Sequence, residues 1–138
     1  MSDFKMEHKN PEGLFSSKAF SQAITVRGKS KTIYIGGQNA INAAGELVGG
    51  GDLELQTKQV LNNIATILAS ENASFADMVK LNIYLREGCD PRVGYKAFQE
   101  TAGLSDNPPL VTVLFVSSVG RPGCLLEIDG IAVVEDKG

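Results

Sequence analysis

The sequence predicts a single α+β domain in which two helices cover one face of a β-sheet. The chain has 138 residues, which fits one domain. Runs rich in β-branched and aromatic residues alternate with two amphipathic segments in the order β-β-α-β-α-β-β. The apolar fraction of 43% is sufficient for an ordinary globular core. Residues 1–15 are largely polar, and we expect them to be an N-terminal extension of this domain, which spans 1–138.

The first half of the chain contains a predicted hairpin and a long helix. Residues 23–26 and 32–35 are β-type runs separated by a polar turn, so they are expected to pair. Gly36 and Gly37 end the second run, and adjacent glycines there indicate either an unusual φ or close backbone approach by another group. Asp52 then opens a helix as its N-cap, and apolar side chains recur at helical spacing to about Glu71.

The second half contains a strand, a helix and two final strands. Residues 78–85 alternate between apolar and polar, and Asp90 and Pro91 open a helix that ends near Gly103. The strand at 109–116 is apolar on both faces. Because the helices cover only one face of the sheet, the other face needs a cover, and a second copy of the chain is the simplest one. We therefore expect a homo-oligomer.

Charge and residue counts argue against several classes of protein. The net charge of −3 gives no support for a nucleic-acid partner. His8 is the only histidine and lies in the polar N-terminus, so a histidine-based triad or metal site is not expected, and no cofactor is implied. Cys89 and Cys124 match no zinc or redox spacing and are expected to be reduced thiols. Without a signal peptide or membrane-length apolar run, the expected location is the cytoplasm.

The last strand carries the residues most suited to chemistry. Glu127 and Asp129 share one strand face with Leu125, Ile131 and Val133. A carboxylate on an apolar face is costly to bury without a partner, so it is either solvated at the sheet edge or positioned for a function. Glu127 lies nearer the middle of the strand than its neighbour. It is therefore the predicted catalytic residue, with a structural or solvated role as the alternative.

Several segments resemble the Rid (YjgF-type) family of imine and enamine deaminases, in the same order along the chain. They are AFSQAI at 19–24, IGGQ at 35–38, GELV at 45–48, QTKQVLNNI at 56–64 and LEIDGIAV at 126–133. The resemblance implies a chorismate-mutase-like fold and a homotrimer with clefts between neighbouring subunits. It also implies hydrolysis of C=N bonds in small metabolites, with Glu127 orienting or deprotonating the attacking water.

The resemblance also implies the residues that line the cleft, and two of them depart from the family pattern. Gly36 and Gly37 fall at cleft positions. Thr112 shares a strand face with Leu110, so it either lines the cleft as a hydrogen-bonding group or simply contacts the subunit interface. Phe20 stands where the family usually has tyrosine, and Leu110 stands where the deaminases have an arginine that binds the substrate carboxylate. We therefore expect a substrate other than the usual 2-imino acid.

Three points remain open from the sequence. Arg92 or Arg121 is a candidate for a relocated anion clamp, although arginines are more often exposed surface residues. A non-catalytic trimer that binds a small metabolite is an alternative function, consistent with the loss of both polar groups. Ribonuclease activity is a third reading, which the negative charge makes the least favoured.

Overall fold

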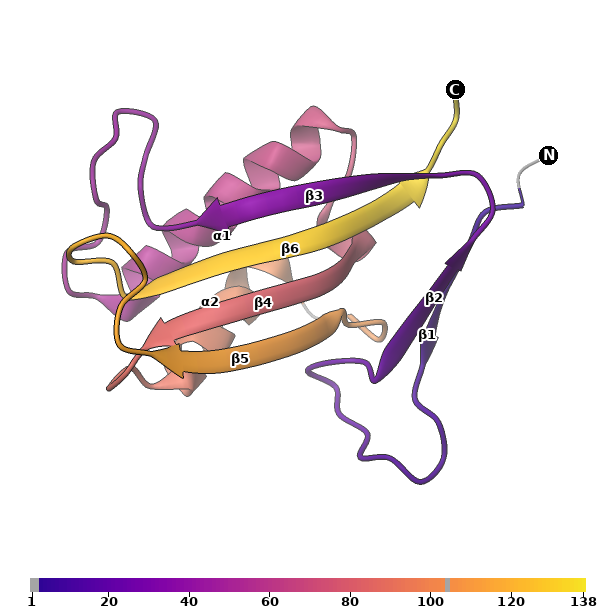
Figure 1. Cartoon of the computed structure of the whole chain (residues 1–138), viewed down its shortest axis with the longest axis horizontal. Helices are drawn as coiled ribbons and strands as arrows, with labels where there is room; N and C mark the ends of the chain where they lie inside the picture. Colours follow the sequence, from indigo (N-terminus) through magenta and orange to yellow (C-terminus); the bar gives the residue numbers. More distant parts are fainter. Residues whose placement is uncertain (1–2, 104) are drawn as a thin grey trace.

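The computed structural model describes residues 3–103 and 105–138 and confirms the predicted α+β class (Figure 1). The elements in chain order are β1 (Lys5–Lys9), β2 (Ala23–Arg27), β3 (Ser30–Gln38), α1 (Leu53–Ser70), a 3-10 helix (Phe75–Asp77), β4 (Met78–Arg86), α2 (Pro91–Ala102), β5 (Leu110–Val116) and β6 (Leu126–Glu135). Strands β3, β6, β4 and β5 form a four-stranded sheet in that order, while β1 and β2 form a separate two-stranded sheet.

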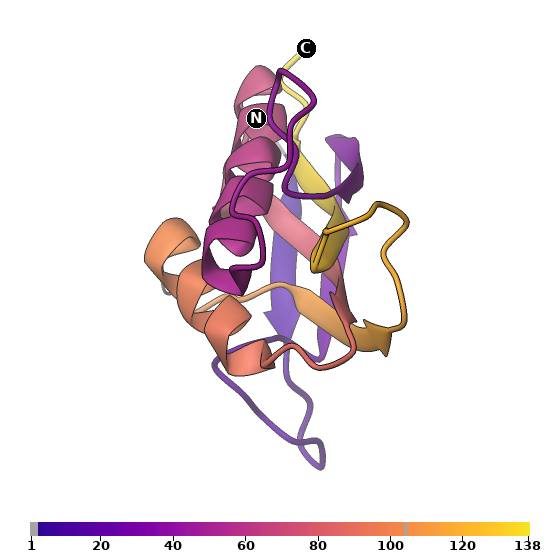
Figure 2. The ribbon, with the colours of Figure 1, turned by 90° about the vertical axis from the view of Figure 1, so that its left-hand side faces the viewer.

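The main sheet is covered on one side only. Strand β6 lies between β3 and β4 and is antiparallel to both, whereas β4 and β5 are parallel and α2 connects them. Both helices lie on the same side of the sheet (Figure 2), as predicted. Leu61, Ile64 and Leu68 of α1 pack against buried residues of the sheet such as Leu81 and Ile128. The opposite side, here called the open face, is left uncovered within one protomer.

The predicted helix ends are confirmed at both helices. The Asp52 carboxylate accepts a hydrogen bond from the Leu55 backbone N–H at 3.0 Å, which satisfies one of the free donors at the start of α1. The Asp90 carboxylate accepts one from the Arg92 backbone N–H at 3.0 Å, with Pro91 in the first turn of α2. Gly103 follows the last residue of α2 with φ of 81°, a conformation that glycine adopts without strain.

The predicted hairpin between residues 23–26 and 32–35 is wrong. Strand β2 pairs with β1, from Lys5 opposite Arg27 to Lys9 opposite Ala23, and β3 pairs with β6. The residues expected to be a polar extension therefore supply a strand. Ile33 and Ile35 of β3 are buried in the main core, where the partner of β3 is the C-terminal strand. Local patterning could not reveal that partner, because the two strands are distant in the chain.

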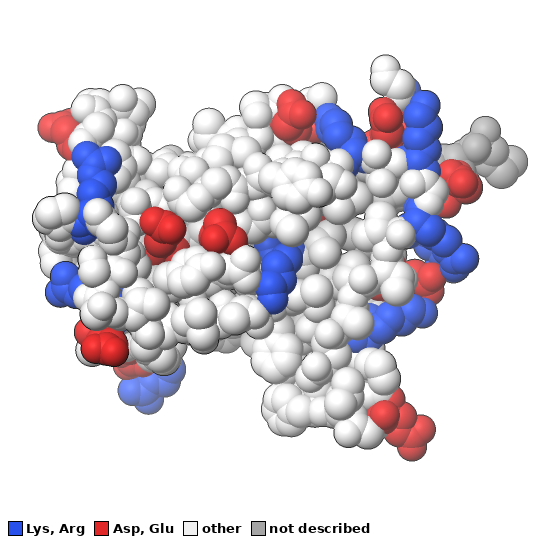
Figure 3. Space-filling view, in the orientation of Figure 1, with Lys and Arg blue, Asp and Glu red and all other residues white. Residues whose placement is uncertain are grey.

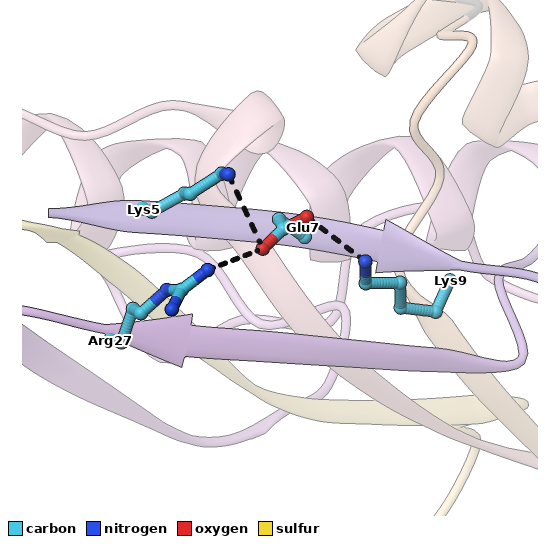
Figure 4. Close-up of polar contacts among 4 residues, drawn as sticks. All are labelled: Lys5, Glu7, Lys9 and Arg27. Atoms are coloured by element: carbon cyan, nitrogen blue, oxygen red, sulfur yellow. Dashed lines mark hydrogen bonds and ion pairs between the residues drawn. The ribbon is translucent and has the colours of Figure 1, made fainter.

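The β1–β2 sheet carries a cluster of charges on its surface (Figure 4). Glu7 lies 2.9 Å from the Lys9 ammonium, 3.2 Å from the Arg27 guanidinium and 3.7 Å from the Lys5 ammonium. The hydrogen bond from Lys9 is the main reason that the pKa of Glu7 is lowered. These groups are exposed to solvent, which screens them, so the cluster contributes little to stability.

The β1–β2 sheet is tied to the start of β5 through His8 and Ser21. The buried Ser21 hydroxyl donates to the Pro108 carbonyl at 2.6 Å, and the Ser21 backbone N–H donates to the Pro109 carbonyl at 3.0 Å. His8 Nδ1 lies 3.0 Å from the same Pro108 carbonyl. His8 therefore has a structural role: with Ser21, it holds β1 and the segment before β2 against the start of the edge strand β5. In the part of the chain that is described, no helix has the length and apolar character to cross a bilayer.

Candidate functional site

Charged side chains gather on the open face, over the middle of the main sheet, with uncharged surface around them (Figure 3). Strand β6 alternates along its length, so that Leu126, Ile128 and Ala132 are buried on the helix side. Glu127 and Asp129 point the other way and are partly exposed. The open face therefore presents two carboxylates at adjacent same-face positions of one strand, as the sequence predicted.

Glu127 is held by groups at the end of β3. The Asn39 side-chain amide donates to Glu127 Oε1 at 3.2 Å and to the Leu126 carbonyl at 3.3 Å. The register between β3 and β6 shifts between Ile35 and Gln38, so Gly36 and Gly37 form a β-bulge opposite β6. A Cβ at position 37 would stand only 2.6 Å from Glu127 Oε2, which explains why a glycine is needed there. The predicted close approach is thus made by Glu127 at Gly37, whereas a Cβ at Gly36 would meet nothing within 4 Å.

Asn39 is in turn positioned from helix α1. The Asn63 side-chain amide donates to the Asn39 carbonyl at 3.2 Å and to the Ile41 carbonyl at 2.9 Å. The Gln59 side chain donates to Asn63 Oδ1 at 2.8 Å, which fixes the orientation of that amide. The sequence analysis gave Asn39 no role. The available signal was a polar amide directly after the Gly-Gly-Gln turn.

Asp129 is engaged by two residues of β4. The Asn82 side-chain amide donates to Asp129 Oδ1 at 2.7 Å. The negative charge of Asp129 raises the pKa of the Tyr84 hydroxyl, with smaller contributions from partial burial, a hydrogen bond to Asp129 and the charge of Glu127. Tyr84 lies directly opposite Glu127 in the sheet. Its phenol therefore stays protonated beside two carboxylates and donates to Asp129. The sequence analysis did not identify Tyr84 as part of the site.

Leu110 and Thr112 share the open face with Glu127 but lie further along the sheet. Leu110 is opposite Lys80 and Thr112 is opposite Asn82 in the parallel pairing of β4 and β5. Tyr84, which is opposite Glu127, is four residues beyond Lys80 on β4. At about 3.3 Å per residue, the cross-strand row of Lys80 and Leu110 is therefore roughly 13 Å from the row of Tyr84 and Glu127. Within one protomer, a small molecule at Glu127 therefore does not reach Leu110.

Phe20, a residue expected at the cleft between subunits, lies away from Glu127 within one protomer. Together with Ala19 and Pro109 it lines an apolar cavity of about 190 Å³ between α2 and the sheet, on the helix side. Val111 and Val113 of β5 border the same cavity. One protomer thus places Phe20 on the helix side and Glu127 on the open face of the sheet.

The two arginines proposed as anion clamps are engaged elsewhere in the protomer. The Arg92 side chain is 90% exposed and binds the helix-capping Asp90, with Nη2 3.0 Å from Oδ2. Arg121 is exposed in the loop before β6 and reaches the Gly45 carbonyl at 3.4 Å. Neither guanidinium contacts Glu127. The described residues also contain no group of three metal-ligating side chains.

The fold and the site together define a class of protein: a four-stranded α+β domain with a fixed carboxylate on an uncovered sheet face. Comparison with known proteins narrows this class. The family model described as Endoribonuclease L-PSP matches residues 12–134. A RutC family protein of Pyrococcus abyssi is 34% identical over 131 residues, covering 90% of this chain and 98% of the relative.

Two further relatives bear on the chemistry and the fold. The 2-iminobutanoate/2-iminopropanoate deaminase of Rattus norvegicus is 37% identical over 116 residues, covering 83% of this chain and 80% of the relative. The crystal structure of a Rid family protein from Yersinia pestis superimposes with a TM-score of 0.80 at 34% identity, covering 94% of this chain and 98% of that one. The chain belongs to the Endoribonuclease L-PSP family, whose members are also called Rid or YjgF proteins.

Proposed function

We propose that this protein hydrolyses reactive imines or enamines of small metabolites, with Glu127 as the catalytic residue. The observation that carries the proposal is the fixed Glu127 carboxylate. Asn39 holds one of its oxygens at 3.2 Å and the Gly37 backbone lies against the other. The names of several relatives, which are 2-iminobutanoate/2-iminopropanoate deaminases, point to the same chemistry.

The proposed reaction is the addition of water to the imine carbon followed by loss of ammonia. Glu127 accepts a proton from the water as its oxygen bonds to that carbon, and the proton then passes to the nitrogen. The hydroxyl of the addition product then gives up its own proton, which Glu127 can carry to the nitrogen, as the C–N bond breaks, so ammonia leaves and a carbonyl compound remains. The Glu127 charge also favours the protonated iminium, which is the more electrophilic form. This mechanism needs neither a metal nor a cofactor.

The proposed active form is a homotrimer. The open face carries exposed apolar side chains, with Tyr34 79% exposed and Leu114 50% exposed, and such surfaces mark association sites. A head-to-tail interface repeated three times closes into a ring with three equivalent clefts. The ring would cover the open face and bring residues of one copy close to Glu127 of the next. Both cysteines are free, which suits a reducing compartment such as the cytoplasm.

The proposed substrate differs from a simple 2-imino acid in the usual pose. Leu110 has no donor to offer a carboxylate, and Arg92 already binds Asp90. The expected substrates are therefore small metabolites whose imine carbon can bind near Glu127 without a guanidinium at position 110.

The test is a coupled assay in which an amino-acid oxidase generates imines in place and their hydrolysis is followed. Glu127→Gln should remove most of the turnover while leaving the circular dichroism spectrum and the oligomeric state unchanged. Glu135→Gln, at the far end of the same strand, is the matched control and should retain activity. Full activity of Glu127→Gln would contradict the proposal.

The second candidate is a trimer that binds a small metabolite without converting it. The apolar side chains at Leu110 and Phe20 favour it, since both positions lack the polar groups expected of a deaminase. In that case the native protein and Glu127→Gln should both bind a ligand and neither should turn it over. Ribonuclease activity is the least supported candidate. The net charge is −3, and His8 contacts the Pro108 carbonyl rather than Glu127.

A further inference from the structure

Lys80 is a cation on the open face without an acidic partner. Its ammonium donates a hydrogen bond to Thr112 Oγ1 at 2.6 Å, across from β4 to β5. Among the residues that the structure describes, no carboxylate lies within 4.0 Å of its Nζ. The nearby acid on the same face, Asp129, is bound by Asn82 instead. An ammonium has three donors, so two remain available.

The surroundings of Lys80 make this arrangement costly once the open face is covered. Its cross-strand neighbours are apolar, with Leu110 on β5 and Ile131 on β6. Lys80 itself is already partly buried. Covering the face with a second copy would remove water from the ammonium, and a desolvated charge without a counter-charge is strongly unfavourable. Asp129, whose charge the neutral Asn82 amide leaves in place, offsets part of this cost, and a bound anion in contact with the ammonium would offset more of it.

We propose that Lys80 and Thr112 form an anion-binding subsite that holds the carboxylate of the substrate. Thr112 accepts from Lys80 through its oxygen, so its own hydroxyl hydrogen is free to donate. The pair offers two neighbouring donors, which match the two oxygens of a carboxylate. Lysine supplies a point charge where an arginine would supply a planar fork, so the carboxylate sits in a different pose. This inference rests on the proposed function and names its substrate class: small imines that carry a carboxylate.

We assign the subsite and Glu127 of one cleft to different copies of the chain. Thr112, which holds the Lys80 ammonium, lies two residues before the row of Tyr84 and Glu127 and two strands away from β6, which is roughly 12 Å between backbones, whereas a small substrate carries its carboxylate only a few bonds from the imine carbon. A neighbouring copy placed over the open face closes that distance. Each cleft would then take its anion-binding pair from one subunit and its carboxylate base from the next.

The first experiment measures binding of pyruvate, a stable carboxylate that resembles the hydrolysis product, by titration calorimetry. Pyruvamide, its neutral analogue, is titrated in parallel. Lys80→Met should weaken pyruvate binding by about tenfold or more, and Thr112→Val should also weaken it. Lys80→Arg should retain most of the affinity, and pyruvamide should bind the native protein and Lys80→Met equally. The control is Lys31→Met, which removes an equal charge from the exposed start of β3.

Two results would overturn the subsite: no pyruvate binding by the native protein, or equal binding by Lys80→Met. Because this assay needs no turnover, it separates the subsite from the proposed reaction. A protein that binds pyruvate through Lys80 yet hydrolyses no imine would retain the subsite and lose the proposed function.

The second experiment tests the shared cleft by co-expressing Lys80→Met with Glu127→Gln. Each variant alone should have little activity toward a carboxylate-bearing imine. Random assembly of equal amounts gives both native residues to about a quarter of all clefts, and to one cleft in each mixed trimer, so a corresponding part of the activity should return. Mixed trimers that stay as inactive as the parent variants would contradict the assignment of the two residues to different copies.

Discussion

The Gly37 backbone lies directly against the Glu127 carboxylate, and a Cβ at position 37 would stand 2.6 Å from Glu127 Oε2. The contact joins two residues that are distant in the chain through the β-bulge at the end of β3. The group in the way is the tip of a flexible side chain. A larger residue at position 37 would therefore move the carboxylate rather than unfold the protein, which separates site geometry from stability.

Gly37→Ala should lower kcat/KM for imine hydrolysis by up to about 100-fold, because a displacement of about 1 Å at a catalytic group costs this much. Gly36→Ala should cost less, since a Cβ there meets nothing within 4 Å. Gly51→Ala, in the loop before α1 and equally unobstructed, is the neutral control. Thermal melts of all three should stay close to that of the native protein. Equal losses at positions 36 and 37 would contradict the proposed crowding of Glu127.

Asn39→Ala should lower kcat more than it raises KM. The change removes the amide that donates to Glu127 Oε1, so the carboxylate loses its fixed orientation. A loss of about tenfold is expected for one hydrogen bond to a charged group. Asn62→Ala, on the exposed side of α1, is the matched control. Steady-state kinetics give both constants, and an unchanged kcat for Asn39→Ala would show that Glu127 needs no help from this amide.

Leu114→Lys should dissociate the proposed trimer. Leu114 is 50% exposed on the open face, so a charge there would be buried by the neighbouring copy. Light scattering after size exclusion should give a mass near three times the 14.7 kDa chain for the native protein and near the single chain for the variant. Leu55→Lys, 51% exposed on α1, should remain trimeric. A native protein that runs as a monomer would remove the basis of the shared cleft.

Cys89 should react with thiol reagents well before Cys124. Cys124 is 1% exposed, and burial is the main reason that its pKa is raised, so little thiolate forms at neutral pH. Cys89 is only partly buried. Mass spectrometry after brief labelling should find the modification on Cys89 alone, with Cys124 labelled only in denaturant. Equally fast labelling of both would mean that the loop before β6 opens readily.

Asp129→Asn should lower the pKa of the Tyr84 hydroxyl. The negative charge of Asp129 is the largest cause of its raised pKa, since it disfavours a second negative charge nearby. Removing that charge lets the phenol ionise at lower pH. Ultraviolet titration of the phenolate, compared with the same titration of Tyr84→Phe, isolates this tyrosine from the other two. A titration curve that does not move would place the two side chains out of electrostatic contact.

The sequence by itself determined the elements whose signals are local. The Asp52 and Asp90 caps, the helical spacing of α1 and the alternation along β4 and β6 depend on neighbours within a few residues, and each was confirmed. Glu127 stood out because an acid on an apolar strand face needs an explanation. The family followed from matched segments in the right order, and the comparisons confirmed it.

Only the tertiary structure decided which strands pair and which polar groups meet. The pairing of β2 with β1, and of β3 with β6, joins segments whose local patterns fit several partners equally well. Tyr84 and Lys80 look like ordinary strand residues until the sheet register places them on the open face. Asn39 looks like a loop residue until the end of β3 brings its amide to Glu127. Register depends on long-range packing of the whole core, and a one-residue slip would turn every one of these side chains to the other face.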